Sequence, residues 1–536
     1  MPIRRLALAM TSAAALMAAF TPASAAEPEF TAERFRSHVD FLASDLLEGR
    51  DTGSRGYDIA ASYVANQFAG LGLVPAGEGT GAAGWYQNVP FVTALRADAP
   101  TLSIGGVSFD AAKQAAIGPS TLAEAQTLTA QAVFVGFGLD APAAGFDDYR
   151  GLDVRGKYVV VLAGSPKGTP SEIGAHLNSM KARFAQDRGA RGIITLRTLA
   201  DQKRYGFDVL AHRAGEKSIG WAQPDGKAFA LAPGIEIAAT LDTAPAEALF
   251  AGARRTLADV LAEADKQGGR PRGFALKPEV SITRRTSLGK LSSTNVIGMI
   301  PGSDPALANE YVLLTAHLDH VGTDPARKGD QIFNGAMDNA TGVATLIEVA
   351  RAFVTSGVKP RRPILLAALT AEEKGLLGAE YLAKHPVVPG KVVGVVNFDM
   401  PVLLYDFTDV IAFGANHSTL GDAVARAGSA LGIALSPDPL PQEGLFTRSD
   451  HYKFVREGIP SVFLMTGFGN GGDKQFTSFL STHYHKVSDS PALPIDWAAG
   501  AKFAKINYLI AKEIADAPTA PAWKADSFFK PAGTAR

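Results

Sequence analysis

The sequence predicts an α/β protein whose mixed, mostly parallel sheet is flanked by helices, with a β-rich module inserted into the same chain. The second half alternates near-continuous apolar runs with amphipathic segments, and the middle carries short β-rich runs between Gly, Pro and Asp turns. Apolar runs without alternation are typical of strands buried on both faces of a parallel sheet. Alternating strands and helices are typical of α/β domains.

The expected elements follow from these patterns in chain order. Two amphipathic helices are predicted near the start, over 31–50 and 56–73. Four buried strands are predicted in the second half, over 311–317, 363–370, 392–400 and 459–467. The helices predicted around and between them cover 342–357, 371–385 and 418–432.

The chain has 536 residues, too many for one hydrophobic core, so more than one domain is expected. Between 98 and 280 the sequence pattern changes to short β-rich runs such as AVFVGFG, KYVVVLAG and GIITL. We therefore predict one α/β domain in two pieces, 26–97 and 281–515, with the module 98–280 inserted between them. The Pro- and Ala-rich tail, 516–536, is predicted to be irregular.

Residues 1–25 have the pattern of a secretory signal peptide. Arg4 and Arg5 precede an apolar stretch that ends in Ala23-Ser24-Ala25, an A-x-A cleavage site. An N-terminal membrane anchor is the alternative, but small residues dominate the apolar part. We expect an exported protein, periplasmic or secreted, and no other apolar stretch is long enough to span a membrane.

Charge and cysteine content narrow the possible functions. The formal charge is −1, and removal of the leader with its two arginines would take it to −3. This balance does not favour nucleic acid or an anionic membrane surface as a partner. The chain has no cysteine, so disulfides are excluded and any metal site is confined to His, Asp and Glu.

Acidic and histidine side chains follow several predicted strands. Sites in open α/β sheets form at the carboxyl ends of strands, so these side chains are expected to lie close together. The candidates are His317 and Asp319 after the first strand, Glu372 and Glu373 after the second, Asp399 after the third, Asp338 before a helix, and Tyr484 and His485 near the end.

Each of these residues also has a structural explanation when it is taken alone. A single strand-end histidine is more often structural than a ligand. Asp338 could cap the following helix, Asp399 could cap a turn, and Thr370 to Glu373 has the spacing of a capping box. Together, however, the buried acids lack enough Lys and Arg partners, and unpaired buried carboxylates are costly. A divalent metal would satisfy them.

Histidine and carboxylate ligands without thiolate suit zinc in a catalytic site, with manganese or cobalt as alternatives. Two neighbouring metals would share a bridging carboxylate. His317 and Asp319 lie on one face of a strand, so the Asp319 carboxylate is expected to accept the second ring N–H of His317. His320 would point the other way. Of Glu372 and Glu373, one would bind metal and the other would take a proton from water.

Five motifs in this order, AHLDHVG, NGAMDNATGVA, AEEKGLLGA, VNFDM and YHKVSD, resemble the signature of the co-catalytic zinc aminopeptidases, metallopeptidase family 28. The front piece, 39–73, is similar to the start of bacterial members. The segments GFDDYRGLDVRGKYVVVLAG and FAQDRGARGIITL resemble the protease-associated domain inserted in many of them. The resemblance covers nearly the whole chain after the leader and implies a zinc-peptidase, phosphorylase-like fold.

The resemblance also implies roles for the candidate residues. One zinc would be held by His317, Asp338 and Asp399, and the other by Asp338, Glu373 and His485. Glu372 would be the general base and acid, Asp319 would support His317, and the Tyr484 hydroxyl would stabilise the oxyanion. The implied substrates are peptides with a free N-terminus.

Other functions on the same fold are compatible with the sequence. A carboxypeptidase, another amidohydrolase, or a glutaminyl cyclase that uses one zinc could occupy the same scaffold, and a non-catalytic receptor is a different class again. Beside the motifs, Ser449 or Asp450 is expected to cap a helix, and Asp489 is expected to cap or support the last helix.

Overall fold

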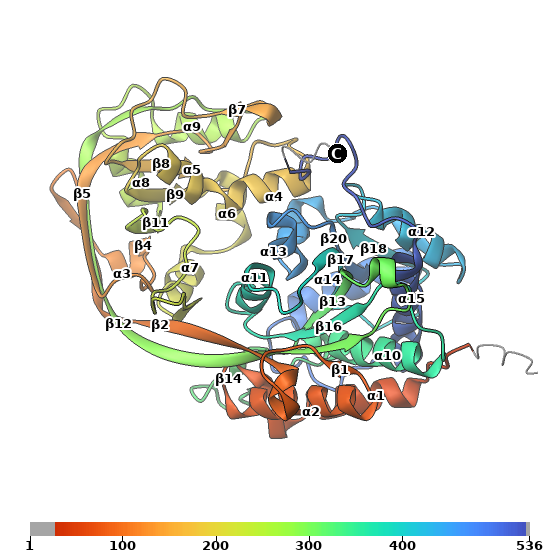
Figure 1. Ribbon diagram of the computed structural model, residues 1–536. Coiled ribbons are helices and arrows are strands. Elements are labelled where there is room, and N and C mark those ends of the chain that lie inside the picture. The colour runs from red at the N-terminus through yellow and green to blue at the C-terminus, as the bar shows by residue number, and fades with distance from the viewer. Residues whose placement is uncertain (1–26, 532–536) are drawn as a thin grey trace, which may run out of the picture.

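The computed structural model describes residues 27–531, which form two lobes side by side (Figure 1). The predicted leader, 1–25, and the end of the predicted tail lie outside the described residues. Among the described residues, no helix has both the length and the apolar composition needed to cross a membrane.

The first lobe is built on a sheet whose middle strands are parallel. Neighbouring strands run in the order β19, β18, β20, β17, β13, β16 and β12. Their bounds are Ala434–Ser436, Asp409–Phe413, Ser461–Thr466, Lys391–Phe398, Glu310–His317, Ile364–Leu369 and Phe274–Ile300. The four strands β20, β17, β13 and β16 are mutually parallel, so their carboxyl ends meet at one edge. The predicted fold class is confirmed.

Helices cover both faces of this sheet because alternate strand residues point to opposite sides. In β13, Val312 and Leu314 enter the larger core, whereas Tyr311 and Leu313 enter the smaller one. The larger core is covered by α1 (Ala32–Leu42), α2 (Arg55–Gly70), α10 (Thr341–Thr355), α12 (Leu420–Ser429), α14 (Gly472–Thr482) and α15 (Trp497–Asp516). The smaller core is covered by α11 (Leu377–Lys384) and α13 (His451–Arg456).

Two predicted helices are shorter than the sequence pattern suggests. The first α-helix ends at Leu42, and Asp45–Arg50 forms a 3-10 turn in which Glu48 and Gly49 have positive φ. The helix predicted from 371 begins only at Leu377, and its side-chain capping box is not formed.

The second lobe has its own core, around the parallel strands β5 (Ala125–Phe134), β8 (Tyr158–Leu162), β9 (Gly192–Leu196) and β11 (Ile237–Leu241). Short strands β3 (Val107–Phe109), β4 (Ala115–Ala116), β6 (Asp140–Ala141) and β7 (Phe146–Asp147) complete this lobe. Strand β10 (Ser218–Trp221) pairs with β2, and its side chains pack against Leu377 of the first lobe. The sequence texture did not anticipate its helices, which are α3 (Ala111–Gln114), α4 (Ser171–Ser179), α5 (Lys181–Asp187), α6 (Leu199–Arg204), α7 (Phe207–Arg213), α8 (Thr243–Leu249) and α9 (Leu257–Ala264).

Two long strands join the lobes. β2 (Tyr86–Ile104) and β12 pair antiparallel from Tyr86 opposite Val296 to Ile104 opposite Val280, and both run from one lobe into the other (Figure 1). At the first-lobe end, the short β1 (Val74–Pro75) also pairs with β12. The second lobe therefore lies at one end of a long antiparallel pair of strands and is inserted between them in the sequence.

The first helix docks on the lobe through a buried ionic cluster. Glu348 of α10 is 1% exposed, and its carboxylate accepts hydrogen bonds from the Nε (2.9 Å) and Nη2 (2.8 Å) of Arg351. Arg34 Nε and His38 Nε2 of α1 each lie 3.6 Å away. Burial alone would raise the pKa of Glu348, but the contacts with His38 and Arg351 outweigh it and lower that pKa to about 2.

We expect the substitution Glu348→Gln to lower the free energy of unfolding by about 3 kcal/mol at pH 7, because it removes the buried negative charge that pairs with Arg351 and Arg34. The ionised carboxylate stabilises the fold fully above its unfolded pKa of 4.5, and this stability is lost as pH falls through about 2. The difference from wild type should therefore shrink below pH 4.5. Urea unfolding at several pH values measures it, with the exposed Glu33→Gln on α1 as control.

Candidate active site

The carboxyl edge of the parallel strands brings the predicted site residues together. His317 is the last residue of β13, Asp399 follows β17, and Glu372 and Glu373 follow β16. Asp338 comes from the turn before α10, and Tyr484 and His485 follow α14. The structure therefore brings these segments together at one edge of the sheet.

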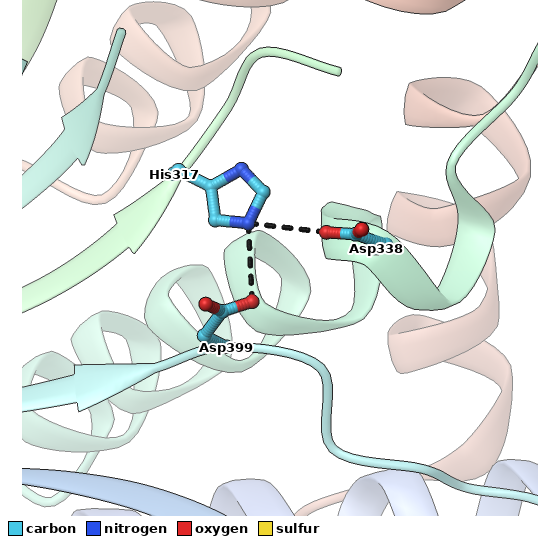
Figure 2. Close-up of side chains that lie close together, drawn as sticks. All are labelled: His317, Asp338 and Asp399. Carbon is cyan, nitrogen blue, oxygen red and sulfur yellow. Dashed lines mark hydrogen bonds and ion pairs between the residues drawn. The ribbon is translucent and has the colours of Figure 1, made fainter. Parts of the chain in front are cut away.

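A first group consists of His317, Asp338 and Asp399 (Figure 2). The Nε2 atom of His317 lies 3.2 Å from Asp338 Oδ1 and 3.1 Å from Asp399 Oδ1. All three side chains are buried, with exposures of 1%, 2% and 6% for His317, Asp338 and Asp399. One nitrogen and two carboxylate oxygens thus surround a single point.

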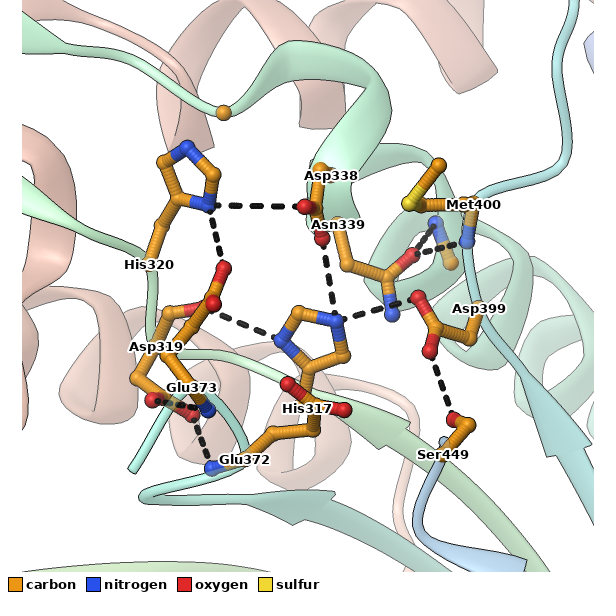
Figure 3. A network of polar contacts seen from close by, with 12 residues as sticks. His317, Asp319, His320, Asp338, Asn339, Glu372, Glu373, Asp399, Met400 and Ser449 are labelled. Carbon is orange, nitrogen blue, oxygen red and sulfur yellow. Dashed lines mark hydrogen bonds and ion pairs between the residues drawn. The ribbon is translucent and has the colours of Figure 1, made fainter. Parts of the chain in front are cut away.

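A second group surrounds the other oxygen of Asp338. His485 Nε2 lies 3.2 Å from Asp338 Oδ2 and 3.1 Å from Glu373 Oε2. His320 also enters this group, since its Nδ1 lies 2.9 Å from Glu373 Oε1 and 3.9 Å from Asp338 Oδ2 (Figure 3). The expectation that His320 points away from the site is wrong, because β13 ends at His317 and the alternation of a strand does not extend to His320.

The donor set fits divalent cations. Ligand atoms of His317, Asp338 and Asp399 lie within 4.8 Å of one another, as do those of His320, Asp338 and Glu373, with Asp338 common to both groups. Although its Nε2 is close to two carboxylates, His485 makes no hydrogen bond through this buried atom to any described residue. One oxygen of Asp338 and one of Glu373 thus lie close to a histidine nitrogen that they do not hydrogen-bond, an arrangement that a shared metal ion would explain.

The histidines and carboxylates of the two groups compensate one another's charge. Burial alone would lower the pKa of His485, but Asp338 and Glu373 raise it to about 10. Burial and Asp338 would raise the pKa of Glu373, but His320 and His485 lower it to about 2. The pKa of Asp338 is likewise held well below its usual range by His317 and His485, against the effect of burial. Metal binding would require the neutral form of His317 and His485, whose pKa values are both raised here.

Glu372 lies beside this group and makes no side-chain hydrogen bond with the described residues. Burial raises its pKa well above the usual value, and Asp399, Glu373 and Asp450 act in the same direction, against His317. It lines a pocket of about 60 Å³ together with His317, Asp338 and Asp399. The other walls are Met400, Leu445, Arg448, Phe463, Met465, Phe476, Leu480 and Tyr484.

Tyr484 stacks on His485, with ring centroids 3.9 Å apart. Burial raises the pKa of its hydroxyl far above the usual value, and Asp338 and Glu373 add to this effect. The hydroxyl therefore stays protonated and can donate a hydrogen bond into the pocket.

The backbone is strained at three positions that flank these side chains. Ala371, Met400 and His485 have positive φ of 57°, 42° and 54°, a region that non-glycine residues seldom occupy. Strain of this kind persists where the surrounding structure enforces it, and it is concentrated at functional sites. Here it turns the chain so that the strand ends present Glu372 and Asp399 to the cluster.

Asp319 supports the site differently from the expectation. The Nδ1 of His317 is paired with the backbone carbonyl oxygen of Asp319 at 3.0 Å, not with its carboxylate. The carboxylate instead accepts the backbone N–H groups of Glu372 (3.0 Å) and Glu373 (3.3 Å) and the hydroxyl of Thr52 (3.1 Å). It thereby fixes the turn that carries both glutamates, while the carbonyl sets the tautomer of His317.

Asp489 was expected at the last helix, but it belongs to the site. Its carboxylate accepts the backbone N–H groups of Met337 (2.8 Å) and Asp338 (3.0 Å), whereas α15 is capped by Asp496. The position of Asp338 is further restricted by Gly335, where a Cβ atom would lie 2.3 Å from the Asp338 carbonyl oxygen.

Arg50 is a supporting residue that the motifs did not reveal. Its guanidinium is 1% exposed and donates to the backbone carbonyl groups of Leu42, Leu318, Asn334 and Gly335. Burial lowers its pKa to about 10, so it remains charged at neutral pH. Arg50 thus joins the segment after α1 to the loops that carry His320 and Asp338. The only sequence feature that could have pointed to Arg50 is its place in the front segment LEGRDTG, which resembles the start of bacterial family members.

The Ser449-Asp450-His451 segment also differs from the expectation. Asp450 is at the N-cap position of α13 but makes no side-chain cap, and its buried carboxylate has no hydrogen-bond partner among the described residues. Burial raises the pKa of Asp450 to about 8, and nearby Asp399 and Asp319 also favour the protonated form, against His317. The hydroxyl of Ser449 donates to Asp399 Oδ2 at 2.5 Å instead of capping the helix (Figure 3).

Comparison with known proteins supports a metallopeptidase site at these residues. Residues 295–511, which include every residue of the two groups, match the model of Peptidase family M28. Leupeptin-inactivating enzyme 1 of Streptomyces exfoliatus is 30% identical over 181 residues, which cover 32% of this chain and 36% of that protein. Probable leucine aminopeptidase 2 of Aspergillus oryzae is 28% identical over 181 residues, covering 32% of this chain and 33% of that protein.

Among solved structures, an aminopeptidase from Aneurinibacillus sp. strain AM-1 has a TM-score of 0.51 with 20% sequence identity, covering 92% of this chain and 95% of that one. This likeness shows a common fold. The sequence matches above span about a third of those two relatives, and together with the fold they support the resemblance to metallopeptidase family 28.

We expect Arg50→Lys to weaken zinc binding about tenfold, because partners that orient ligands typically contribute that much. Lysine cannot reproduce the planar fork of donors, so some of the four carbonyl groups would lose their partner. Competition with a chromogenic chelator measures the affinity. Arg55→Lys, an exposed change in the same segment, is the control, and equal affinity in both variants would contradict the supporting role of Arg50.

Proposed function

We propose that this protein is an exported zinc-dependent aminopeptidase that hydrolyses the N-terminal peptide bond of peptides with the help of two metal ions. The observation that carries the proposal is the pair of ligand groups sharing Asp338, with Glu372 and an apolar pocket beside them. The match to Peptidase family M28 supports it. In this proposal the second lobe is an inserted protease-associated domain, and the leader directs export to the periplasm or beyond.

His317, Asp338 and Asp399 would hold one zinc ion, and Asp338, Glu373 and His485 the other, with His320 beside the second. Two divalent ions at such a site supply an acidified water and a polarised scissile carbonyl group, and manganese or cobalt could replace zinc.

The chain's own residues would perform the proton transfers. Glu372 is free of other side-chain partners, so it can take a proton from the attacking water and return it to the leaving amine. The protonated Tyr484 hydroxyl would donate a hydrogen bond to the oxyanion. The apolar walls of the pocket, formed by Phe463, Met465 and Phe476 among others, suit an apolar side chain at the N-terminal position of the substrate.

A carboxypeptidase is the second candidate, and one observation favours it. Arg448 lines the same pocket, and its guanidinium is only loosely paired, 3.8 Å from Glu443. A guanidinium beside the scissile bond could bind a substrate carboxylate. The two candidates differ in which end of the substrate they need free.

The first test compares aminoacyl-anilides with their N-acetylated twins, on metal-stripped protein before and after addition of zinc. We expect activity to require zinc, to disappear on acetylation, and to be highest for medium-sized apolar residues, because the pocket is small and apolar. Cleavage of acetylated peptides from the carboxyl end would instead establish the carboxypeptidase.

A second test separates proton transfer from metal binding within the adjacent glutamates. Glu372→Gln should lower kcat by about 10²–10⁴-fold, the range for loss of a general base, with zinc content unchanged. Glu373→Gln should instead lose zinc, as measured by elemental analysis of the dialysed protein. If Glu372→Gln lost zinc and Glu373→Gln kept it, the assigned roles would be reversed.

A further inference from the structure

Residues 440–452, which we call the pocket loop, connect the candidate site to the second lobe. The loop contains two 3-10 turns, Pro441–Glu443 and Leu445–Thr447, and the start of α13. Leu445 and Arg448 line the pocket, and Ser449 contacts Asp399. The loop therefore touches both the expected position of the substrate and a candidate metal ligand.

The hydrogen bond from Ser449 to Asp399 has a fixed direction. Thr315 can donate its hydroxyl to Asn397 Oδ1 (2.6 Å), so the amide group of Asn397 presents its Nδ2 to Ser449 (2.6 Å). Ser449 accepts that hydrogen bond and has a single proton, which it gives to Asp399 Oδ2 at 2.5 Å. Asp399 Oδ1 is thus left to face His317.

All the members of this chain of hydrogen bonds are buried. Thr315 and Asn397 are fully buried, Ser449 is 1% exposed, and the three come from β13, β17 and the pocket loop. Water cannot readily replace a lost member, so the orientation of Asp399 depends on where the pocket loop places Ser449.

The second lobe contacts the pocket loop and its neighbours through α4 and the end of α6. The hydroxyl groups of Ser179 and Tyr452 lie 2.7 Å apart, and Arg204 pairs with Glu443 at 2.5 Å. Gly444 has a φ of +59°, and a Cβ atom there would lie 3.2 Å from the Cβ of Ala175 in α4. Helix α4 therefore packs directly against the loop backbone.

Glu172 of α4 strengthens the same contact. Its carboxylate accepts the backbone N–H of Gly414 at 3.0 Å and pairs with His417 Nε2 at 2.5 Å. Both partners follow β18 in the first lobe and lie beside the pocket loop, because the ring of His417 is 6.1 Å from that of Phe446.

The end of the chain fills the seam between the lobes. Phe528 packs against the hydrophobic cores of both lobes. The ring of Phe529 lies 5.3 Å from that of His176 in α4, 4.7 Å from that of His417 and 5.0 Å from that of Phe446. These aromatic contacts join α4, the chain end and the pocket loop in one packed unit.

We propose that the second lobe positions the active site. Helix α4 holds the pocket loop in place, directly through Ser179 and indirectly through the pairing of Glu172 with His417, whose ring lies against Phe446 of the loop. The loop, through Ser449, orients Asp399. Glu172 and Ser449 are positioning residues in this proposal, which rests on the proposed function for the identity of Asp399 as a metal ligand. The second lobe would then contribute to metal affinity and to KM without touching the substrate.

Two variants and two matched controls test the proposal on the full-length protein. Ser449→Ala removes the hydroxyl that orients Asp399, and Ser461→Ala removes another buried hydroxyl, which bonds the Ile459 carbonyl in the same lobe. Glu172→Ala removes one contact between the lobes, the one with Gly414 and His417, and Glu236→Ala removes an ion pair with Arg191 within the second lobe. Zinc affinity and hydrogen exchange of residues 440–452 are measured alongside kcat and KM.

We expect Ser449→Ala to weaken zinc binding about tenfold, and Ser461→Ala to leave it unchanged. Glu172→Ala should speed exchange in the pocket loop about fivefold, the factor for one net hydrogen bond, and raise KM for apolar substrates more than it lowers kcat. Glu236→Ala should change neither quantity.

Two outcomes would overturn different conclusions. Zinc affinity unchanged in Ser449→Ala, together with loop exchange unchanged in Glu172→Ala, would overturn this inference while leaving the proposed function in place. Wild-type protein that binds no zinc would overturn the proposed function, and with it the role of Ser449. The exchange measurement needs neither metal nor substrate, so it judges the contact between the lobes in either case.

Discussion

The arrangement of the whole candidate site depends on one buried carboxylate, that of Asp338. Its two oxygens face different histidines, His317 on one side and His485 on the other. A carboxylate that is 2% exposed cannot rely on water, so every neighbouring segment has to bring it a compensating charge or a hydrogen bond. The loops after β13 and β16 and the segment after α14 all converge on it for this reason.

This requirement explains why supporting residues come from distant parts of the sequence. Asp489 holds the backbone on either side of the Met337–Asp338 peptide bond, and Arg50 joins the preceding loop to the segment after α1. Neither touches the point where an ion would sit. They keep like-charged carboxylates close together when electrostatic repulsion would otherwise separate them, which is the usual role of groups behind a metal ligand.

The fold class and the convergence of the site were predictable from the sequence, because both follow from apolar strands whose parallel carboxyl ends share an edge. The finer contacts were not predictable. His320 was placed on the wrong side because a period of two applies only while the chain remains a strand, and β13 ends at His317. Ser449 and Asp489 are residue types that often cap helices, and only the tertiary structure shows that their side chains hydrogen-bond elsewhere. The helices of the second lobe were missed because they are short, from four residues in α3 to nine in α4.

The pairing of β2 with β12 has a geometric consequence for how the two lobes are related. The second lobe is not attached by flexible linkers but extends from the antiparallel ribbon of β2 and β12. The register of this ribbon, interrupted around Arg285, fixes both the distance and the facing direction of the lobe. Removing one residue from each strand would shorten the ribbon by about 3.4 Å and exchange its two faces, whereas removing two from each would preserve the faces. The length of this ribbon therefore sets the position of the lobe in steps of one residue. Relatives with longer or shorter ribbons keep α4 against the pocket loop only if each strand differs by an even number of residues.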